Sequence, residues 1–322
     1  MDILEQFFKK QKKVGKSDSL VRNYRYDLEE FFRVTGIRES RDVFQVVIED
    51  IERYLEELRE RECTGNTINR RISAIKSFVR YLLKNRRRTL RRLKRDKNTN
   101  PEVLEYMRSQ IEEYEEIIAL ERVKAMEKER LPFTIDELWL LFNSTKNRFR
   151  GLAYRNYLMI KFAAVGTGAR NTAVRLLRKS DLDCSSCNAE CNNCIPTAKL
   201  ERKGKVGTKI RVRIEKGLCQ ELYIYIHDPD HPQNVVFPSR SGGFLSISSL
   251  DKILYRIMEN AGIERKGRTF HSLRHTFITE GIKNGTPYGH MARQVDHAGK
   301  LGITGKYEHM DARDLEIHFI QL

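Results

Sequence analysis

The chain has 322 residues, with 60 Lys and Arg against 44 Asp and Glu, so its formal net charge is +16. Its mean hydropathy is −0.58, and no apolar run approaches the roughly 18 residues of a membrane span, so we expect no transmembrane helix. The N-terminus lacks the apolar stretch of a secretory signal, and we expect a cytoplasmic protein. The positive charge predicts a polyanionic partner, with nucleic acid as the first expectation.

The first part of the chain is predicted to be helical. No proline precedes Pro101, and proline is what most often interrupts a helix. Apolar residues recur at helical spacing over 17–32, 46–58 and 67–83, which predicts three amphipathic helices. Because strand-like alternation is absent, we expect residues 1–85 to form a small helical bundle.

A strongly basic run and an acidic helix follow the bundle. Residues 84–97 read KNRRRTLRRLKRDK, with nine Lys and Arg against one Asp. Such a run is either a solvated surface or a contact with phosphates, and the sequence leaves both open. Residues 101–130 carry an apolar stripe among many Glu residues, which predicts one long packing or linker helix rather than a DNA-binding face.

The remainder of the chain mixes helices with a short strand region. Thr134 and Glu137 form a capping box at the start of the first helix. Further helices are expected at 158–164, 248–261, 272–283 and 291–295, and the alternating KIRVRI of 209–214 predicts a half-exposed strand. The predicted fold class is therefore mostly α with a small antiparallel β-sheet, an α+β fold.

Four short segments of this second part combine Arg, His and Tyr. They are Thr-Gly-Ala-Arg at 167–170, His-Ser-Leu-Arg-His at 271–275, Gln-Val-Asp-His at 294–297 and Lys-Tyr-Glu-His at 306–309. With Asn-Thr-Ile-Asn-Arg-Arg at 66–71, Leu-Pro-Phe-Thr-Ile-Asp-Glu-Leu at 131–138 and Val-Val-Phe-Pro-Ser-Arg at 235–240, they occur in an order that resembles the tyrosine recombinases of the phage-integrase and Xer class. The resemblance spans most of the chain. It implies a SAM-like helical core-binding domain over 1–98, a linker helix over 99–130 and a catalytic domain over 131–322.

The resemblance also implies a catalytic set, in which Tyr307 attacks a DNA phosphate and keeps the 3′ phosphate as a covalent phosphotyrosine. Two arginines clamp the phosphate oxygens with fixed forks of donors, one histidine acts as the general base, and a second histidine adds a hydrogen bond. A lysine of a β-hairpin protonates the 5′ oxygen, and Lys205 is preferred with Lys203 as the alternative. The implied residues are Arg170, Lys205, His271, Arg274, His297 and Tyr307.

The same resemblance implies that DNA is also contacted by the core-binding domain. The contacts would come from the segment that begins at residue 66 and from the basic run. The candidate residues are Thr67, Asn69, Arg70, Arg71, Lys76, Arg86, Arg87, Arg88, Arg91 and Arg92.

Two departures from the family pattern stand near the site. Ala173 occupies the position, three residues after Arg170, where relatives usually have Glu. The spacing from His297 to Tyr307 is one residue longer than usual. Whether Tyr307 acts within its own subunit or in a neighbouring one stays open.

A cysteine cluster lies outside the family pattern. Its CxxC-x3-CxxC spacing suits a tetrahedral site of four thiolates, and structural zinc is the preferred ligand, with an iron–sulfur cluster, disulfides or free thiols as alternatives. Cys63 and Cys219 are expected to be buried thiols. The cluster consists of Cys184, Cys187, Cys191 and Cys194.

The leading hypothesis is a site-specific DNA recombinase or integrase that works without ATP or Mg²⁺. Its expected partner is double-stranded DNA with a specific recombination site, on which it assembles as a homotetramer, whereas the free protein is a monomer or dimer. One alternative is relaxation of DNA in the manner of a type IB topoisomerase. Another is a catalytically inactive DNA-binding protein with a zinc docking element.

Overall fold

The computed structural model describes residues 3–37, 42–96, 98–124, 131–146, 151–183, 195–202, 207–231, 233–296 and 310–321. The predicted Lys205, its alternative Lys203, His297, Tyr307 and the cysteine cluster lie outside these residues. The chain divides into two units, Met1–Lys128 and Glu129–Leu322. None of the described helices is long and apolar enough to cross a membrane.

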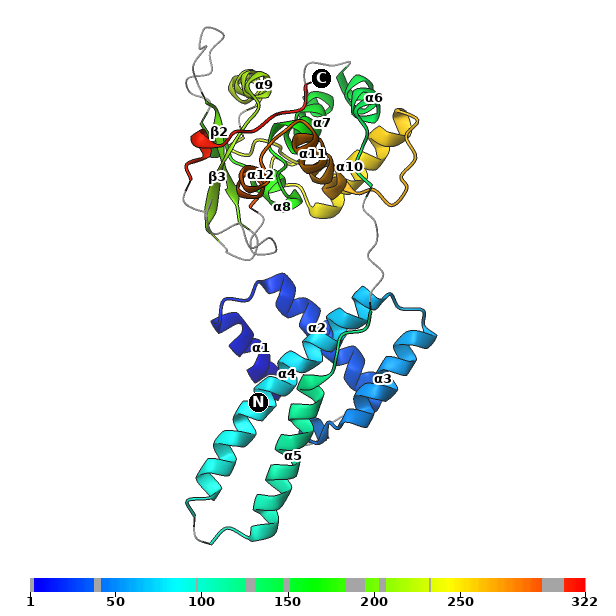
Figure 1. Ribbon diagram of the computed structural model, residues 1–322, viewed down its shortest axis with the longest axis vertical. Coiled ribbons are helices and arrows are strands. Elements are labelled where there is room, and N and C mark those ends of the chain that lie inside the picture. Colours follow the sequence, from blue (N-terminus) through cyan, green and yellow to red (C-terminus); the bar gives the residue numbers. More distant parts are fainter. Residues whose placement is uncertain are drawn as a thin grey trace. The chain divides into compact units, whose positions relative to one another are not determined.

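The first unit is entirely helical in its described part, as Figure 1 shows. Ser17 caps the second helix, since its hydroxyl accepts a hydrogen bond from the amide of Leu20 at 3.3 Å, and Gly36 ends it in the left-handed conformation. Thr64 caps the fourth helix in the same way. The helices are α1 (Ile3–Lys13), α2 (Asp18–Thr35), a 3₁₀ turn (Asp42–Gln45), α3 (Ile48–Glu60), α4 (Gly65–Leu93) and α5 (Pro101–Ala119).

Aromatic side chains hold the bundle together. The ring of Phe78, on α4, meets the rings of Phe7 and Phe32 edge-on at 5.3 and 5.8 Å, and Phe31 meets Tyr54 edge-on at 5.3 Å. All five side chains are buried. Edge-to-face pairs of this kind each contribute about 0.5–1.5 kcal/mol beyond the burial of their area. The predicted bundle is confirmed, with α1 as an additional helix.

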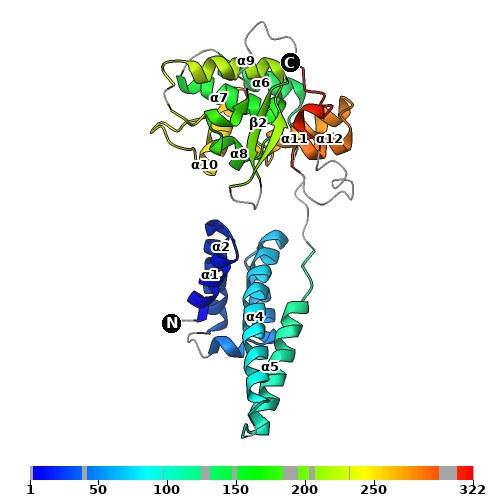
Figure 2. The same ribbon diagram turned by 90° about the vertical axis from the view of Figure 1, so that its left-hand side faces the viewer.

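The helices α4 and α5 form a long antiparallel hairpin (Figure 2). The helix predicted over 67–83 continues through the basic run to Leu93, because Lys and Arg are good helix formers. The helix predicted over 101–130 ends at Ala119. The chain after it is held by Asn69, whose side chain bonds both the amide and the carbonyl of Val123, at 2.9 and 2.8 Å.

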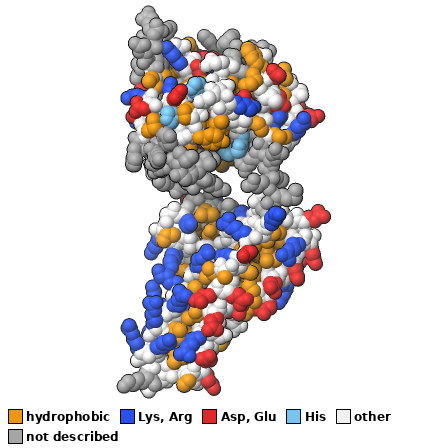
Figure 3. Space-filling view, viewed as in Figure 1, with side chains coloured by type: hydrophobic (Ala, Val, Ile, Leu, Met, Phe, Trp, Pro, Cys, Tyr) orange, Lys and Arg blue, Asp and Glu red, His pale blue; other side chains and the backbone are white. Residues whose placement is uncertain are grey.

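The two sides of this hairpin differ in charge. Figure 3 shows Lys and Arg gathered along the distal part of α4 and Asp and Glu over α5. Arg87 of α4 forms an ion pair with Glu115 of α5, and the guanidinium of Arg86 lies 4.7 Å from the ring centre of Phe44. Residues 84–93 of the basic run are therefore part of an ordered helix.

The second unit combines helices with a three-stranded sheet (Figure 1). The helix α6 begins with the predicted capping box. The amide of Glu137 donates to the Thr134 hydroxyl at 3.2 Å, and the amide of Thr134 donates to the Glu137 carboxylate at 2.9 Å. The elements are α6 (Ile135–Lys146), α7 (Gly151–Lys161), a π-helical segment (Phe162–Gly166), α8 (Asn171–Leu176), a 3₁₀ turn (Lys179–Asp181), β1 (Leu182–Asp183), β2 (Thr197–Glu201), β3 (Lys209–Arg213), α9 (Lys216–His227), α10 (Ile247–Asn260), α11 (Phe270–Lys283), α12 (Tyr288–Gln294) and a second 3₁₀ turn (Ala312–Asp314).

The sheet is antiparallel in the order β1-β2-β3. In the β2–β3 pair, Thr197 lies opposite Arg213 and Glu201 lies opposite Lys209, so the two strands form an antiparallel hairpin. The strand predicted over 209–214 is β3, and the predicted fold class is confirmed. The helix α9 was not predicted, because its apolar residues follow directly on the strand pattern.

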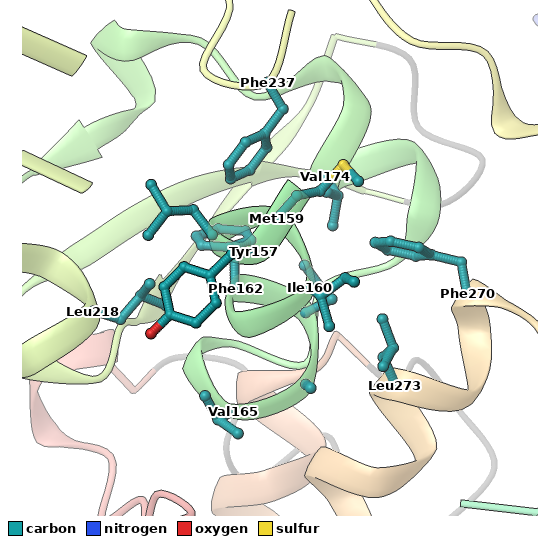
Figure 4. Close-up of a cluster of buried hydrophobic side chains, with 14 of the residues drawn as sticks. Tyr157, Met159, Ile160, Phe162, Val165, Val174, Leu218, Phe237, Phe270 and Leu273 are labelled. Atoms are coloured by element: carbon teal, nitrogen blue, oxygen red, sulfur yellow. The ribbon is translucent and has the colours of Figure 1, made fainter. Parts of the chain in front are cut away.

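The core of the second unit surrounds the π-helical segment (Figure 4). Every residue from Phe162 to Gly166 is buried. Leu218 of α9 packs so closely that a Cβ at Gly166 would lie 2.2 Å from its Cδ2 atom. Phe270 and Leu273 of α11 pack on the other side. This segment leads directly into the Thr-Gly-Ala-Arg turn.

Candidate active site

Arg170 is presented by a turn that is fixed to the core. The hydroxyl of the fully buried Thr167 donates to the carbonyl of Phe162 at 2.8 Å. Gly168 has a φ of +66°, and a Cβ there would lie 2.5 Å from a ring carbon of Phe277, so the turn requires glycine. Arg170 follows in extended backbone as the N-cap residue of α8.

Arg274 is a buried charge without a carboxylate partner in the described chain. Its side chain lies on α11 and is 3% exposed. Its Nη1 donates to the carbonyl of Gly168 at 2.8 Å and its Nη2 to the carbonyl of Val295 at 2.6 Å. Burial, reinforced by the nearby charge of Arg170, lowers the pKa of Arg274 to about 9. An anion that bound here would stabilise this charge.

The two arginines converge on consecutive residues at the end of α12. Arg274 bonds the carbonyl of Val295. Arg170 bonds Asp296, with Nη1 3.1 Å from Oδ2 and Nη2 donating to the main-chain oxygen at 2.6 Å. The sequence therefore identified two guanidiniums, 104 positions apart in the numbering, that the fold brings to one place. Paired guanidiniums are well suited to bind a phosphate.

Sequence reasoning missed two charged residues of this site. Arg202, immediately after β2, places Nε and Nη2 at 3.0 and 2.8 Å from Oδ1 of Asp296. Asp296 therefore bridges Arg170 and Arg202, which places a third guanidinium beside those of Arg170 and Arg274. The one signal in the sequence was that each residue is the neighbour of a candidate catalytic residue. Asp296 directly precedes His297, and Arg202 directly precedes Lys203.

His271 lies in the first turn of α11, one helical turn before Arg274. That turn begins at Thr269, whose amide donates to the hydroxyl of Ser272 at 3.2 Å. The His271 ring meets the ring of His275 edge-on, with centres 5.1 Å apart. His271 is partly exposed, so it can reach a ligand, and the i, i+3 spacing places it on the same side of α11 as Arg274.

The β2–β3 hairpin that carries the candidate lysines is anchored to the site. The amide of Arg202 donates to the carbonyl of Thr208 at 3.0 Å, which closes the loop. Gln294, which is 1% exposed, ties α12 to β3, because its side chain accepts from the amide of Arg213 at 2.9 Å and donates to its carbonyl at 2.8 Å. The hairpin is confirmed, and the choice between Lys205 and Lys203 stays a prediction.

Ala173 is buried on α8. It lines a small hollow together with Arg170, Arg274 and Asp296, and this hollow has about 10 Å³ of free volume. That is room for about one water molecule. The helix α8, Asn-Thr-Ala-Val-Arg-Leu, has no acidic residue of its own.

Several of the candidate DNA-binding residues of the first unit contact the protein itself. Arg70 forms an ion pair with Asp27 at 2.5 Å, and the buried Arg71 donates to the hydroxyl of Tyr54 at 2.9 Å. Lys76 bonds the carbonyl of Leu120. Thr67 forms a hydrogen bond with the capping residue Thr64. The contacts of three further candidates were given with the α4–α5 hairpin: Asn69 with Val123, Arg86 with Phe44 and Arg87 with Glu115.

The remaining candidates lie on the distal part of α4. Arg88, Arg91 and Arg92 are exposed, and in the described part of the chain they form no ion pair. These three are therefore the residues of the predicted set that are free to meet a phosphate backbone. DNA contact by all ten residues stays a prediction.

The described residues contain no group of three or more potential metal ligands, and the four clustered cysteines lie outside them. Cys63 is a free, partly exposed thiol, so its predicted burial is wrong. Cys219 is fully buried but disulfide-bonded, so its prediction as a thiol is also wrong.

Comparison with known families gives two matches that cover most of the chain. The model of the "Phage integrase family" matches residues 132–313. The model of the "Phage integrase, N-terminal SAM-like domain" matches residues 4–86. The distal end of α4 and all of α5 lie between the two matched regions.

Individual relatives span nearly the whole chain. It is 26% identical over 321 residues to "Tyrosine recombinase XerD" of Halalkalibacterium halodurans, covering 98% of this chain and 96% of the relative. It is 24% identical over 296 residues to "Tyrosine recombinase XerC" of Anoxybacillus flavithermus, with 91% and 88% covered. Among solved structures, a lambda integrase(75-356) dimer bound to a COC' core site matches with a TM-score of 0.64, at 14% identity over 92% of this chain and 94% of that one. The XerH recombinase bound to difH substrate matches with a TM-score of 0.63, at 18% identity and 95% and 81% coverage.

Proposed function

This chain belongs to the phage integrase family and is a site-specific tyrosine recombinase, and we propose that it cuts and rejoins DNA through a covalent bond between Tyr307 and the 3′ phosphate. The observation that supports the chemistry is the convergence of Arg170 and Arg274 on Val295 and Asp296. These residues immediately precede the segment that carries His297 and Tyr307.

In the proposed reaction, the phenol of Tyr307 attacks the scissile phosphate and the 5′ hydroxyl leaves. His271 takes the phenolic proton as general base, and Lys205, with Lys203 as the alternative, protonates the 5′ oxygen. Arg170 and Arg274 stabilise the negative charge on the non-bridging oxygens, together with His297. Because the phosphotyrosine keeps the energy of the broken phosphodiester, rejoining needs neither ATP nor Mg²⁺.

The test of this proposal uses a DNA substrate with a nick beside the cleavage site. Loss of the short fragment prevents rejoining and traps the covalent adduct. The parent chain is expected to form an adduct that maps to a 3′ phosphate, and Tyr307→Phe is expected to abolish the adduct while it leaves DNA binding nearly intact. An adduct that persists in Tyr307→Phe would place the nucleophile elsewhere.

The relatives favour recombination over the alternative of supercoil relaxation, because the XerD and XerC relatives are tyrosine recombinases. We propose that the working assembly is a homotetramer on two DNA duplexes, as two cuts per duplex require. A lambda integrase tetramer bound to a Holliday junction, with a TM-score of 0.63 at 15% identity, supports this arrangement. Strand exchange between two sites should therefore occur, beside slower or absent relaxation of plasmid supercoils.

DNA contact by the distal part of α4 is a further part of the proposal. Neutralising Arg88, Arg91 and Arg92 together by Gln should weaken DNA binding and reduce the slope of log affinity against log salt by about 0.9 for each lost phosphate contact. A matched control replaces Arg33, Arg53 and Arg59 of α2 and α3 by Gln, which removes the same charge from other surfaces. Equal effects of the two triple variants would show that net charge, and not a local contact, sets the affinity.

Structural zinc at Cys184, Cys187, Cys191 and Cys194 also remains a proposal, and the disulfide bond of Cys219 counts for the disulfide alternative. It rests on the CxxC spacing, because two such pairs can each chelate one metal ion through a tight turn. Metal analysis of protein purified without added metal should find one zinc per chain, and Cys187→Ser with Cys191→Ser should lose it. Protein that holds no zinc and no free thiols in this cluster would support the disulfide alternative instead.

A further inference from the structure

The carboxylate of Asp296 accepts three N–H groups of two arginines. Arg202 supplies two of them, to Oδ1, and Arg170 supplies one, to Oδ2. The Asp296 side chain is 10% exposed and the two arginine side chains are 21–22% exposed. We propose that Asp296 is a positioning residue that orients the catalytic Arg170, and that Arg202 is a third guanidinium of the phosphate site. This inference rests on the proposed function.

Arg170 needs an external partner because its own helix provides none. It is the N-cap residue of α8, and α8 has no acidic side chain. A free Arg side chain loses rotamer entropy when it is fixed. Asp296 fixes both η nitrogens of Arg170 at once, one through the carboxylate and one through the main-chain oxygen. The remaining N–H groups of Arg170 then point in a set direction for a ligand.

Arg202 keeps the site positive. A single carboxylate on Arg170 alone would form a neutral pair, and a neutral pair attracts a phosphodiester poorly. With Arg202 on the same carboxylate, the three groups carry a net charge of +1, and the buried Arg274 adds a second positive charge. The carboxylate can thus orient Arg170 without cancelling the charge that binds the substrate.

The backbone of Asp296 allows a clean test of its side chain. Its φ is +50°, in the left-handed region that favours glycine. Glycine adopts this conformation freely. Asp296→Gly therefore removes the carboxylate without straining the backbone, and it enlarges the hollow of about 10 Å³ that Arg170, Arg274 and Asp296 line.

The experiment measures single-turnover adduct formation on the nicked DNA substrate by Asp296→Gly, with and without sodium formate. We expect the rate to fall by about tenfold to a hundredfold, as misplacement of one catalytic group does, while the affinity for DNA changes little. Added formate should restore the rate in proportion to its concentration, because it can occupy the space of the lost carboxylate. Sodium chloride at the same ionic strength should not.

A matched control is Asp183→Gly. Asp183 also bridges two arginines, with Arg211 at 2.8 Å and Arg313 at 3.3 Å, but it lies on β1 and contacts neither Arg170 nor Arg274 among the described residues. We expect its rate to stay near that of the parent chain and not to respond to formate. A formate response in both variants would overturn the inference, since formate would then act on the reaction and not on the Asp296 site.

Two other outcomes would also overturn it. A rate for Asp296→Gly above that of the parent chain, with inhibition by formate, would show that the carboxylate competes with the phosphate. A rate that falls and that formate does not restore, in protein that melts at a lower temperature, would assign Asp296 a purely structural role. If the parent chain itself forms no adduct, the proposed function fails before this inference is reached.

Arg202 is tested separately by Arg202→Lys and Arg202→Gln. Loss of the charge in Arg202→Gln should weaken the affinity for DNA and slow adduct formation, with a smaller salt dependence of binding than in the parent chain. Arg202→Lys keeps the charge and should recover most of the affinity. If Gln and Lys behave alike, or if neither changes binding or rate, Arg202 is not part of the phosphate site.

Discussion

A buried arginine of the first unit, Arg71, and a buried arginine of the second unit, Arg274, have opposite kinds of partner. Arg71 of α4 donates to the hydroxyl of Tyr54 at 2.9 Å and lies 3.6 Å from the carboxylate of Glu30. Arg274 of α11 donates only to carbonyls, those of Gly168 and Val295. Burial lowers the pKa of both, but Tyr54 and Glu30 outweigh it at Arg71 and raise its pKa, whereas the pKa of Arg274 falls to about 9.

The difference separates a structural charge from a functional one. The charge of Arg71 is paired with Glu30 of its own unit, so removal of Arg71 should lower the stability of the fold. The positive charge of Arg274 has no direct ion pair among the described residues, although Asp296 lies close enough to act on it, so removal of Arg274 should be felt where an anion binds. The residue type is the same in the two cases, but Arg274 is the more deeply buried and its partners are carbonyls.

The largest expected effect is that of Arg274→Gln on the reaction. Loss of one charged donor to the developing negative charge should slow adduct formation on the nicked substrate by about a hundredfold to a thousandfold. The melting temperature should stay near that of the parent chain, because an unfavourable buried charge is removed along with its hydrogen bonds. A variant that melts early but reacts at the parent rate would reverse the comparison.

Arg71→Gln should do the opposite. It leaves the Tyr54 hydroxyl without its arginine partner, while Glu30 keeps its ion pairs with Arg61 and Arg33, and it should lower the free energy of unfolding by about 1–3 kcal/mol. Chemical denaturation of the whole chain measures this loss. Adduct formation at saturating DNA, at a temperature well below the transition, should be unchanged, and a large loss of rate there would indicate a direct role in the reaction.

The lowered pKa of Arg274 predicts a pH dependence of binding. The charged form binds the phosphate, so affinity should fall as the pH rises through about 9, by at most about tenfold per pH unit for one linked proton. The measurement uses Tyr307→Phe, so that neither cleavage nor the phenol contributes. Adding Arg274→Gln should flatten this part of the profile, and an equal slope in both proteins would assign it to another group.

The smallest expected effect concerns Asp27, whose carboxylate is fully buried beside Arg70. Burial outweighs the attraction of Arg70 and raises the pKa of Asp27. The folded state therefore binds the proton more tightly than the unfolded state, and stability is lost as the pH rises through the raised pKa. Asp27→Asn should stabilise the chain at neutral pH by about 1 kcal/mol, with a gain that vanishes in acid. A destabilised variant at neutral pH would contradict this.

Local patterns predicted most of the helices, and long-range contacts explain the differences. The caps at Ser17 and Thr134 and the helical spacing of apolar residues are properties of neighbouring positions, and these helices are confirmed. The early end of α5 depends on Asn69, which bonds Val123 across 54 positions. No local sequence pattern predicts such a contact.

The candidate site shows the same limit. Arg170, His271 and Arg274 stand in motifs, and the fold brings the two arginines together as expected. Arg202 and Asp296 belong to no motif, and their contact joins positions 94 apart in the chain. It also requires a left-handed backbone at Asp296. Glycine is the residue that predicts this conformation in a sequence, and aspartate rarely does. The sequence therefore identified the candidate catalytic residues that stand in motifs, but not the charged residues that contact them.

The π-helical segment has a consequence for how this protein fails. Phe162–Gly166 lies at the centre of the second unit's core and continues directly into the turn that presents Arg170. No exposed hinge separates this arginine from the core, because every residue from Phe162 to Ala169 is buried. Heating should therefore not populate a folded but inactive form. The loss of catalytic activity and the melting of the second unit should follow a single curve.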